Sequence, residues 1–334
     1  MNIKSKKELK KNYSFYLWAD TDKKIGLGHL NRLRFFMQEL SKQKIKANFL
    51  TKFNSLSRSL IKNNHFFLSN DISYYVKKMI LPKEFKKDQK NKIIFIDSYN
   101  VNKFFFKLLR ENNIKVVYFN DFKTDKGANL NICVGSNSKN KNFLSGFNFI
   151  PLASEYAKSK KNLLNKKTVL ITLGSADPRH LSLKLTELVS RFDLNILVVV
   201  GKYYSNSLYK KLLSVKSKKI KLIFKPKSLL KYFKKSDSVI CAGGFTVFES
   251  LSLGIPTLCV ELCDNQSVNL INLKKLGLIK VIDYRLNANL KLKPSHLDVL
   301  FNKKYRHFVS KNALKIISRN GSLNILKETI KKLT

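Results

Sequence analysis

The sequence has few cysteines, prolines and glycines, and it contains no long apolar run. Cys133, Cys241, Cys259 and Cys263 form no Cys-x-x-Cys pair, and they lie in apolar segments typical of strands. This placement favours buried free thiols in a reducing cytoplasm over a metal site. Runs such as "NILVVVG" have strand length, far short of the ~18 residues of a membrane helix. The basic N-terminus lacks the apolar stretch of a signal peptide, so we expect a cytoplasmic protein without membrane insertion.

Acidic residues are also scarce. The 334 residues include 22 Asp and Glu but 65 Lys and Arg, so the net charge is +43. Such an excess is compatible with nucleic-acid binding. The excess, however, is mostly lysine spread along the whole chain together with abundant Asn, Ile and Phe, as an AT-rich coding sequence would produce. No RRM, KH, zinc-finger or helix-turn-helix signature accompanies it. We therefore expect attraction for a small polyanionic substrate rather than a nucleic-acid partner.

Short β-rich segments alternate with helical ones, in one series that includes "KIIFIDSY" and "IKVVYFND" and a second that includes "KTVLITLG" and "PTLCVEL". Strands that are apolar on both faces and separated by helices predict parallel sheets. One helical run buries a face made of Leu30, Leu33, Phe36 and Leu40. The sequence predicts an α/β protein with two doubly wound, Rossmann-like domains facing each other across a cleft. Residues 1–154 form the first domain, 155–166 a lysine-rich linker and 167–334 the second.

The segment "KKIGLGHLNRLRFF" places a glycine-rich turn directly before a helix. Gly26 and Gly28 permit close approach of a ligand to the backbone. His29 falls at the helix start, where free N–H groups and the helix dipole favour an anion and a neutral imidazole that can accept a proton. Arg32 lies one turn further on and can reach the same face. The motif is neither a Walker loop nor a complete dinucleotide fingerprint, so a purely structural turn remains the alternative.

The segment "SDSVICAGGFTVFESLSLGIP" predicts a buried strand, a turn at Gly243 and Gly244, and a helix opened by Thr246. The N–H groups of the turn can bind phosphate oxygens. Glu249 would lie in the first helical turn, where a carboxylate can accept both hydroxyls of a ribose. The alternative is a capping box, in which Thr246 and Glu249 bond only the backbone of their own helix.

After the next strand, we expect Asn265 and Gln266 to lie in a loop at the strand end. Side-chain amides at such a position suit sugar hydroxyls, although solvated turn residues would look the same in sequence. No cluster of carboxylates accompanies them, so we expect neither a metal nor a cofactor.

Seven segments occur in the order and spacing of a known enzyme family: "ADTDKKIGLGHLNR", "IDSYNV", "YFNDF", "SGFNFIPLASEY", "TLGSADPRHLSL", "CAGGFTVFESLSLG" and "DNQSVN". From Tyr16 to Gly277 the chain resembles nucleotide-sugar enzymes of the GT-B fold. It is most similar to the UDP-2,4-diacetamido-2,4,6-trideoxy-β-L-altropyranose hydrolases of pseudaminic acid biosynthesis, which are related to the lipid II N-acetylglucosaminyltransferases. The resemblance implies the GT-B fold and a UDP-sugar substrate.

The resemblance implies that His29 is the catalytic histidine, which activates water for attack on the anomeric carbon. It places Tyr99 near the sugar and the phosphates, and Gly174 and Asp177 in the glycine-rich turn that opens the second domain. The expected UDP and phosphate site comprises Gly28, Gly174, Gly243, Gly244, Thr246 and Glu249. The expected sugar site comprises Arg32, Asn265, Gln266 and Asp20.

Several positions depart from the family pattern. Trp18 and Ala153 stand where the family usually has arginine, and Asn120 replaces the first carboxylate of an acidic pair. Ser175 and Ala176 depart from the usual Gly-Ser. Loss of two arginines changes how a diphosphate or the substituents of a sugar can be held, so the resemblance constrains the reaction class more tightly than the exact substrate.

The sequence therefore predicts hydrolysis of a UDP-linked diacetamido-trideoxyhexose at C1, which releases UDP and the free sugar in pseudaminic (nonulosonic) acid biosynthesis. Two alternatives remain open. The first is a GT-B glycosyltransferase that uses a UDP-amino sugar donor and differs only in its acceptor pocket. The second is a non-enzymatic basic protein of the same fold that binds polyanions.

Overall fold

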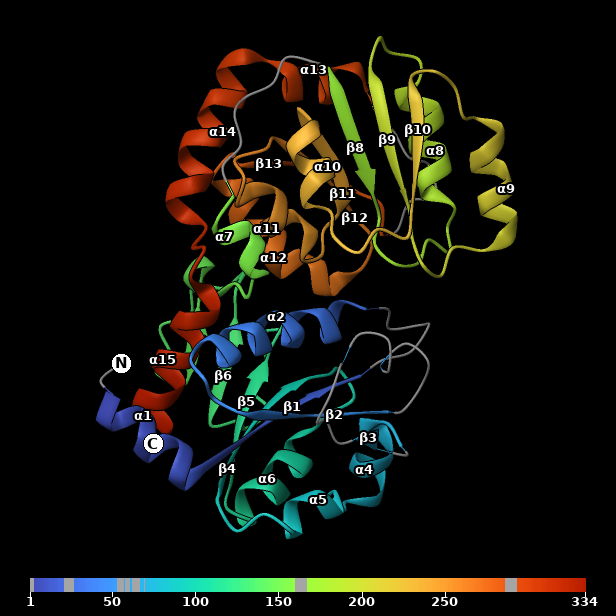
Figure 1. Ribbon diagram of the computed structural model, residues 1–334. Coiled ribbons are helices and arrows are strands. Elements are labelled where there is room, and N and C mark those ends of the chain that lie inside the picture. Colours follow the sequence, from blue (N-terminus) through green and yellow to red (C-terminus); the bar gives the residue numbers. More distant parts are fainter. Residues whose placement is uncertain are drawn as a thin grey trace. The chain divides into compact units, whose positions relative to one another are not determined.

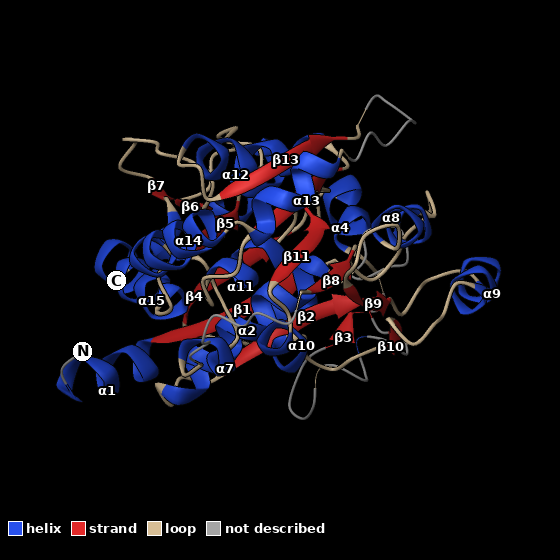
Figure 2. Ribbon diagram, turned by 90° about the horizontal axis from the view of Figure 1, so that it is seen from above, coloured by secondary structure: helices blue, strands red, loops and turns tan. Residues whose placement is uncertain are grey.

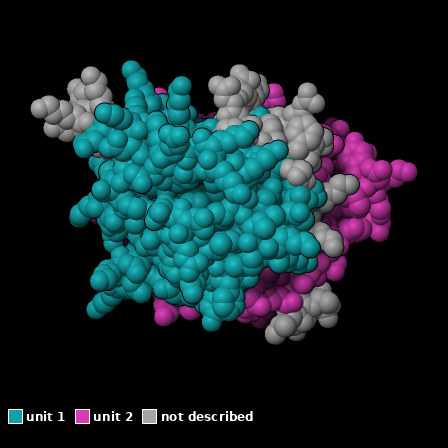
Figure 3. All heavy atoms as spheres, turned by 90° about the horizontal axis from the view of Figure 1, so that it is seen from below, with its two compact units in different colours: residues 1–154, 320–334 teal, residues 155–319 magenta. Residues whose placement is uncertain are grey.

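The structure is a computed structural model, in which the chain divides into two compact units (Figure 3). The first unit consists of Met1–Ser154 and Asn320–Thr334, and the second of Glu155–Arg319. Each is built on one parallel β-sheet covered by helices (Figures 1 and 2). The structure describes residues 3–20, 27–52, 57, 61, 67–68, 70–159, 167–285 and 293–334.

The first unit contains a seven-stranded sheet of order β3-β2-β1-β4-β5-β6-β7, in which all neighbouring strands are parallel. β1 and β4 are neighbours although β2 and β3 lie between them in the sequence. The loops after β1 and β4 therefore diverge, which is where doubly wound sheets bind ligands. The strands are β1 (Tyr13–Ala19), β2 (Ala47–Lys52), β3 (Phe67–Leu68), β4 (Asn91–Asp97), β5 (Ile114–Phe119), β6 (Leu130–Cys133) and β7 (Phe143–Ser145).

Helices cover both faces of this sheet (Figure 1). On one face, α2 packs on β1 and β4 through the four fully buried residues that the helical spacing predicted, Leu30, Leu33, Phe36 and Leu40. On the other face, α4, α5 and α6 enclose a core that contains Tyr16 and Trp18 of β1. The described helices of this unit are α1 (Ile3–Asn12), α2 (Gly28–Lys42), α4 (Ile72–Lys78), α5 (Lys83–Lys86), α6 (Lys103–Glu111), the 3-10 helix η1 (Phe147–Phe149) and α15 (Gly321–Leu333).

The last helix, α15, belongs to the first unit, which corrects the predicted assignment of residues 320–334 to the second domain. It packs on η1 and α2, and Figure 1 shows it in red among elements of the first unit. Gly321 lies so close to the backbone of Ile150 that a Cβ there would clash. Periodicity along a helix reveals its apolar face but not which sheet covers that face, so the sequence did not give this assignment. Of the expected linker, residues 155–159 belong to the second unit and residues 160–166 lie outside the described residues.

The second unit contains a six-stranded parallel sheet of order β10-β9-β8-β11-β12-β13, with its divergence point between β8 and β11. α8, α9 and α13 contribute to one core on this sheet, whereas α10 contacts β8 and α11 contacts β11 and β12. The strands are β8 (Thr168–Thr172), β9 (Asn195–Val200), β10 (Ile220–Phe224), β11 (Ser238–Ala242), β12 (Thr257–Glu261) and β13 (Ile279–Asp283). The helices are α7 (Ser154–Ala157), α8 (Leu181–Val189), α9 (Asn206–Ser214), α10 (Leu230–Lys235), α11 (Thr246–Leu251), α12 (Asp264–Lys275), α13 (Pro294–Phe301) and α14 (Lys303–Ile316).

The prediction of two doubly wound α/β domains is confirmed. All four cysteines are free thiols, and three of them are buried as expected. Cys263 is exposed because it comes after β12 has ended and caps the start of α12. Among the helices that the structure describes, none is both long and apolar enough to cross a bilayer.

Candidate active site

The predicted residues of the first unit gather at the carboxyl end of its sheet. Asp20 follows β1, Tyr99 follows β4, and His29 and Arg32 lie in the first two turns of α2. Gly28 opens α2, and no described atom lies within 4 Å of a Cβ built there. No side chain among the described residues caps α2, so none of those residues occupies its first N–H groups. Gly26 lies outside the described residues.

Arg32 is buried and holds two carboxylates at once. Its Nε and Nη2 donate to Asp97 at 2.7 and 2.6 Å, and its Nη1 and Nη2 donate to Asp121 at 2.7 and 2.9 Å. Burial alone would raise the pKa of Asp121, but the charge of Arg32 and its hydrogen bonds lower that pKa below its ordinary value. The sequence suggested Arg32 as a sugar ligand, whereas the structure directs its guanidinium at the protein's own carboxylates.

His29 is buried beside this cluster. Its Nδ1 lies 3.7 Å from Asp97 Oδ1, which is too long for a hydrogen bond, and Nδ1 has no hydrogen-bond partner among the described residues. The imidazole meets the ring of Tyr99 edge to face, with centroids 4.4 Å apart and planes at 83°. The structure therefore brings together His29 and Tyr99, the two side chains predicted to be catalytic.

Tyr99 is only partly buried, and its hydroxyl donates to Asp121 Oδ2 at 2.8 Å. Burial and the negative charge of Asp121 raise the pKa of Tyr99 far above its usual value, so the hydroxyl stays protonated. The ring also contacts Phe122, an exposed aromatic residue, at a centroid distance of 5.1 Å. Tyr99 thus contacts the buried carboxylate of Asp121 through its hydroxyl and the exposed Phe122 through its ring.

Asp20 is buried at the end of β1. Oδ2 accepts hydrogen bonds from Ser98 Oγ and from Asn100 Nδ2, the latter at 3.1 Å. Oδ1 has no hydrogen-bond partner among the described residues. Burial raises the pKa of Asp20, and the bond from Ser98 and the nearby His29 offset part of this rise. Asp20 therefore ties the loop after β4 to the end of β1.

In the second unit, Gly243 and Gly244 follow β11, at the divergence point of the sheet. Gly243 N–H donates to Val260 O and to Gln266 Oε1, both at 3.2 Å, and a Cβ on Gly243 would lie 2.6 Å from Leu270 Cδ1. No described atom lies within 4 Å of a Cβ on Gly244, nor of one on Gly174, which follows β8 with a φ of +95°. At Gly243 the side chains of Leu270 and Gln266 therefore fill the space that a Cβ would take, whereas Gly244 and Gly174 leave their backbone open to a ligand.

Glu249 lies in α11, and the structure rules out the capping-box alternative. The cap position is Phe245 rather than Thr246, and α11 has no side-chain cap among the described residues. The carboxyl of Glu249 instead accepts a hydrogen bond from the buried hydroxyl of Tyr156. Burial raises the pKa of Glu249 to about 8, with a further rise from Glu155 and an opposing effect of the Tyr156 bond.

Asn265 and Gln266 lie in the first turn of α12 and not in a loop, which corrects the prediction. Gln266 Oε1 accepts from Leu262 N–H at 2.9 Å in addition to Gly243 N–H. This amide oxygen thus fixes the start of α12 against the glycine turn. The sequence did not reveal the α12 start because its cap, Cys263, is not a typical capping residue.

Asp177, in the turn after β8, serves the fold. Its Oδ1 and Oδ2 accept from the N–H groups of Leu181 and Ser182 at 2.9 and 2.7 Å. Both bonds satisfy the free N–H groups at the start of α8. The match of Asp177 to the family turn therefore corresponds here to a helix cap.

The two positions where the family usually has arginine are buried. Trp18 is fully buried and packs edge to face against Tyr75, Phe85 and Phe105. Ala153 is 5 % exposed. Trp18 thus replaces a potential charge by core packing on the sheet face that carries α4, α5 and α6.

Three residues outside the expected catalytic, UDP and sugar sets contact members of those sets: Asp97, Asp121 and Tyr156. Each was visible as part of a matching motif, in "IDSY", "YFNDF" and "LASEY" respectively. Their partners Arg32 and Glu249 could not be read from those motifs. Among the described residues, no group of three or more His, Cys, Asp or Glu could hold a metal ion.

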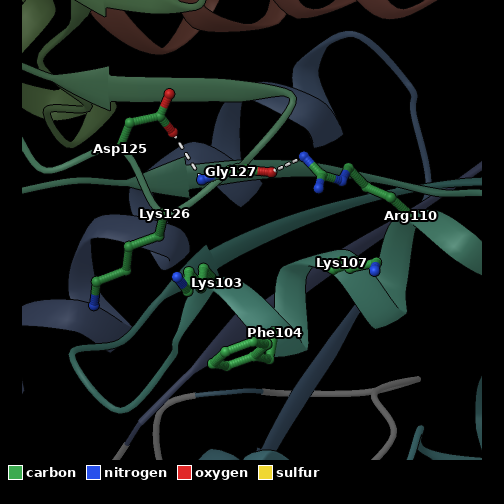
Figure 4. A pocket seen from close by; sticks show the side chains of 7 residues that line it. All are labelled: Lys103, Phe104, Lys107, Arg110, Asp125, Lys126 and Gly127. Carbon is green, nitrogen blue, oxygen red and sulfur yellow. Dashed lines mark hydrogen bonds between the residues drawn. The ribbon is translucent and has the colours of Figure 1, made fainter.

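A basic groove with a volume of about 470 Å³ lies elsewhere in the first unit, between α6 and the loop after β5 (Figure 4). Lys126 in this groove donates to Val101 O at 2.8 Å, and Arg110 donates to Gly127 O. Its cations are therefore partly engaged by the protein itself. The lining residues are Lys103, Phe104, Lys107, Arg110, Asp125, Lys126 and Gly127.

Two doubly wound parallel sheets, each with open loops at its divergence point, define the GT-B class. Solved structures agree on this fold. Acinetobacter baumannii MurG matches with a TM-score of 0.63 and 15 % identity over 96 % of this chain and 100 % of that one. S. aureus MnaA, solved with UDP, matches with a TM-score of 0.65 and 12 % identity over 96 % of this chain and 98 % of that one.

The chain belongs to the family of the glycosyltransferase family 28 C-terminal domain, which matches residues 155–329. An uncharacterised protein of Methanocaldococcus jannaschii is 30 % identical over 272 residues, 72 % of this chain, and the chain spans 54 % of that relative. The spore coat polysaccharide biosynthesis protein SpsG of Bacillus subtilis is 21 % identical over 75 % of this chain and 78 % of its own length.

Proposed function

We propose that this protein hydrolyses a UDP-linked diacetamido-trideoxyhexose at C1 and releases UDP and the free sugar for nonulosonic acid synthesis, as in the pseudaminic acid route. The observation that carries the proposal is the pairing of His29 with Tyr99 beside two buried carboxylates. Family membership supports a nucleotide-sugar substrate. The name of the Bacillus subtilis relative, which concerns polysaccharide biosynthesis, is consistent with a sugar pathway.

In this reaction His29 takes a proton from water as the water oxygen attacks the anomeric carbon. The bond between that carbon and the diphosphate oxygen breaks, and the electron pair leaves with UDP. Diphosphate is a good leaving group, so the protein mainly has to position water and stabilise the negative charge that develops on the phosphates. Backbone N–H groups at Gly28 and Gly244 are suited to the second task, because both positions have open space beside the backbone.

Glu249 is the residue we assign to the ribose of the nucleotide. It is the acidic residue in the first turn of α11, and its carboxyl accepts a hydrogen bond from Tyr156. A carboxylate in its ionised form can accept both ribose hydroxyls. Asn265, in the first turn of α12, is suited to contact the sugar or the diphosphate through its amide.

The test is release of UDP from UDP-2,4-diacetamido-trideoxyhexose and from UDP-N-acetylglucosamine, with detection of the free sugar. We expect the wild-type protein to act on the first substrate and His29→Ala to lose at least about 100-fold in kcat. The exposed His307 on α14 provides a matched control, and His307→Ala should retain full activity. Turnover that is unchanged in His29→Ala would remove His29 from the mechanism.

Glycosyl transfer is the second candidate, because the matching family is one of glycosyltransferases. The same assay separates the two reactions. A hydrolase forms UDP and free sugar at equal rates without any acceptor. A transferase forms UDP slowly until an acceptor is added, and then the sugar appears on the acceptor instead of in solution.

A further inference from the structure

Arg32 binds two carboxylates, and each of these also lies beside a side chain that the proposed reaction uses. The first is Asp97, whose Oδ1 lies 3.7 Å from Nδ1 of His29. The other, Asp121, accepts the hydroxyl hydrogen of Tyr99 through Oδ2. One guanidinium is therefore connected to both side chains that the proposed reaction uses, to His29 through Asp97 and to Tyr99 through Asp121.

The geometry of this cluster is stiff. A planar guanidinium that makes paired hydrogen bonds to two carboxylates fixes the plane of each carboxylate, which a lysine cannot do. Without that guanidinium, two buried carboxylates would repel each other, and one would take up a proton or turn away. Arg32 also follows His29 by three positions in α2, so the same helical face carries both.

Two consequences follow for the reacting groups. A carboxylate facing Nδ1 favours the neutral tautomer in which Nδ1 carries the proton, which leaves the lone pair on Nε2 as the base. The hydroxyl hydrogen of Tyr99 is committed to Asp121, so toward a ligand this oxygen offers lone pairs and acts as an acceptor.

We propose that Arg32 is a positioning residue that, through Asp97 and Asp121, sets the tautomer of His29 and the direction of the Tyr99 hydroxyl, and that it is not a sugar ligand. This inference rests on the proposed function for its catalytic meaning. The cluster of two carboxylates and one guanidinium has a net charge of −1, which also stabilises the imidazolium as it forms.

The test combines nitrogen NMR with kinetics. With ¹⁵N-labelled histidine, and the His29 signals assigned from their loss in His29→Gln, we expect Nδ1–H in the wild-type protein at pH 8. In the variants Asp97→Asn and Arg32→Lys we expect part or all of His29 to carry its proton on Nε2, which is the tautomer that free histidine prefers. In both variants we expect kcat to fall at least about 100-fold while KM changes less than about threefold. This combination indicates the loss of an interaction that is made in the transition state.

A matched control uses another buried arginine–aspartate pair, Arg306 with Asp237 in the second unit, joined at 2.8 Å. Arg306→Lys perturbs a buried ion pair of the same kind and should leave the His29 tautomer, kcat and KM unchanged. Asp97→Asn is nearly isosteric and keeps the bond between Arg32 and Asp121. It therefore carries the test if Arg32→Lys does not fold.

The outcomes separate the two proposals. A wild-type protein that releases UDP while Nε2 of His29 carries the proton overturns the role of Arg32 alone. A rise in KM without a fall in kcat for Arg32→Lys also overturns it, since that is the signature of a lost sugar contact. Absence of UDP release in a protein whose His29 tautomer depends on Asp97 overturns the hydrolase proposal and leaves the positioning geometry intact.

Discussion

Tyr156 donates a hydrogen bond to Glu249 inside the second unit, and burial raises the pKa of the Glu249 carboxyl to about 8. The bond from Tyr156 partly opposes that rise, and the nearby Glu155 adds to it. A carboxyl with such a pKa is largely protonated at neutral pH. The raised pKa therefore favours the protonated form of the carboxyl that we assign to the ribose.

The first prediction concerns stability. In the unfolded chain the pKa of Glu249 lies near its ordinary value of 4.5, whereas burial in the folded chain raises this pKa to about 8. The folded state binds more protons between these values, so the contribution of Glu249 to the free energy of unfolding falls as pH rises from about 4.5 to 8. Urea unfolding at pH 5, 6, 7 and 8 should show this fall, by at most a few kcal/mol.

Glu249→Gln should remove that pH dependence, because glutamine does not titrate. The exposed neighbour Glu155 supplies the control, and Glu155→Gln should keep most of the fall. Equal slopes in the wild-type protein and in Glu249→Gln would show that Glu249 is already ionised at neutral pH in the folded chain.

The second prediction concerns nucleotide binding. If ribose hydroxyls donate to Glu249, the carboxyl must lose its proton when UDP binds. The affinity for UDP should then increase between pH 6 and 8, by up to about tenfold per pH unit. Isothermal titration calorimetry in two buffers of different ionisation enthalpy would detect the released proton. In the wild-type protein the hydrogen bond from Tyr156 lowers the pKa of Glu249. Tyr156→Phe removes this bond, so the pKa should rise and the increase in UDP affinity should move to higher pH.

The third prediction separates two neighbouring glycines. Gly243→Ala places a Cβ against Leu270 and Gln266, and should lower the free energy of unfolding by about 1–3 kcal/mol. Gly244→Ala meets no described atom within 4 Å and should change stability by less than about 0.5 kcal/mol. If phosphates approach the backbone at Gly244, the same variant should weaken UDP binding at least about tenfold. Unchanged UDP affinity in Gly244→Ala would place the phosphates elsewhere.

The fourth prediction concerns α15. Gly321→Ala would force a Cβ into the backbone of Ile150, which cannot yield as a side chain can, and should cost about 1–3 kcal/mol. The single tryptophan, Trp18, lies in the core of the first unit, so its fluorescence reports unfolding there. The exposed Lys331 of the same helix offers the control Lys331→Ala. A chain that ends at Arg319 should lose stability in this signal by more than Gly321→Ala does.

Much of the fold was predictable from the spacing of apolar residues. The four leucine and phenylalanine positions of α2 are fully buried, and the two series of β-rich segments became the two parallel sheets. Local patterns succeed here because a strand or helix must bury its apolar face wherever it packs.

The candidate site was predictable only as a set of motifs. Arg32 meets Asp97 and Asp121 across 65 and 89 positions, and nothing in the local sequence says which partner a buried arginine will take. The pattern Thr246-x-x-Glu249 satisfies the rule for a capping box, yet the helix has its cap one residue earlier. Spacing gives candidate roles, and long-range contacts decide among them.

The return of the chain to its first unit affects how the protein is made. During synthesis, residues 155–319 leave the ribosome as a complete unit, while the earlier residues still lack the closing helix that begins at Gly321. The portion translated first is thus the last to be completed. Until residues 321–333 have been synthesised, the nascent N-terminal half exposes the surface of α2 and η1 that α15 will cover, which makes this interval the one in which a chaperone would have a binding site.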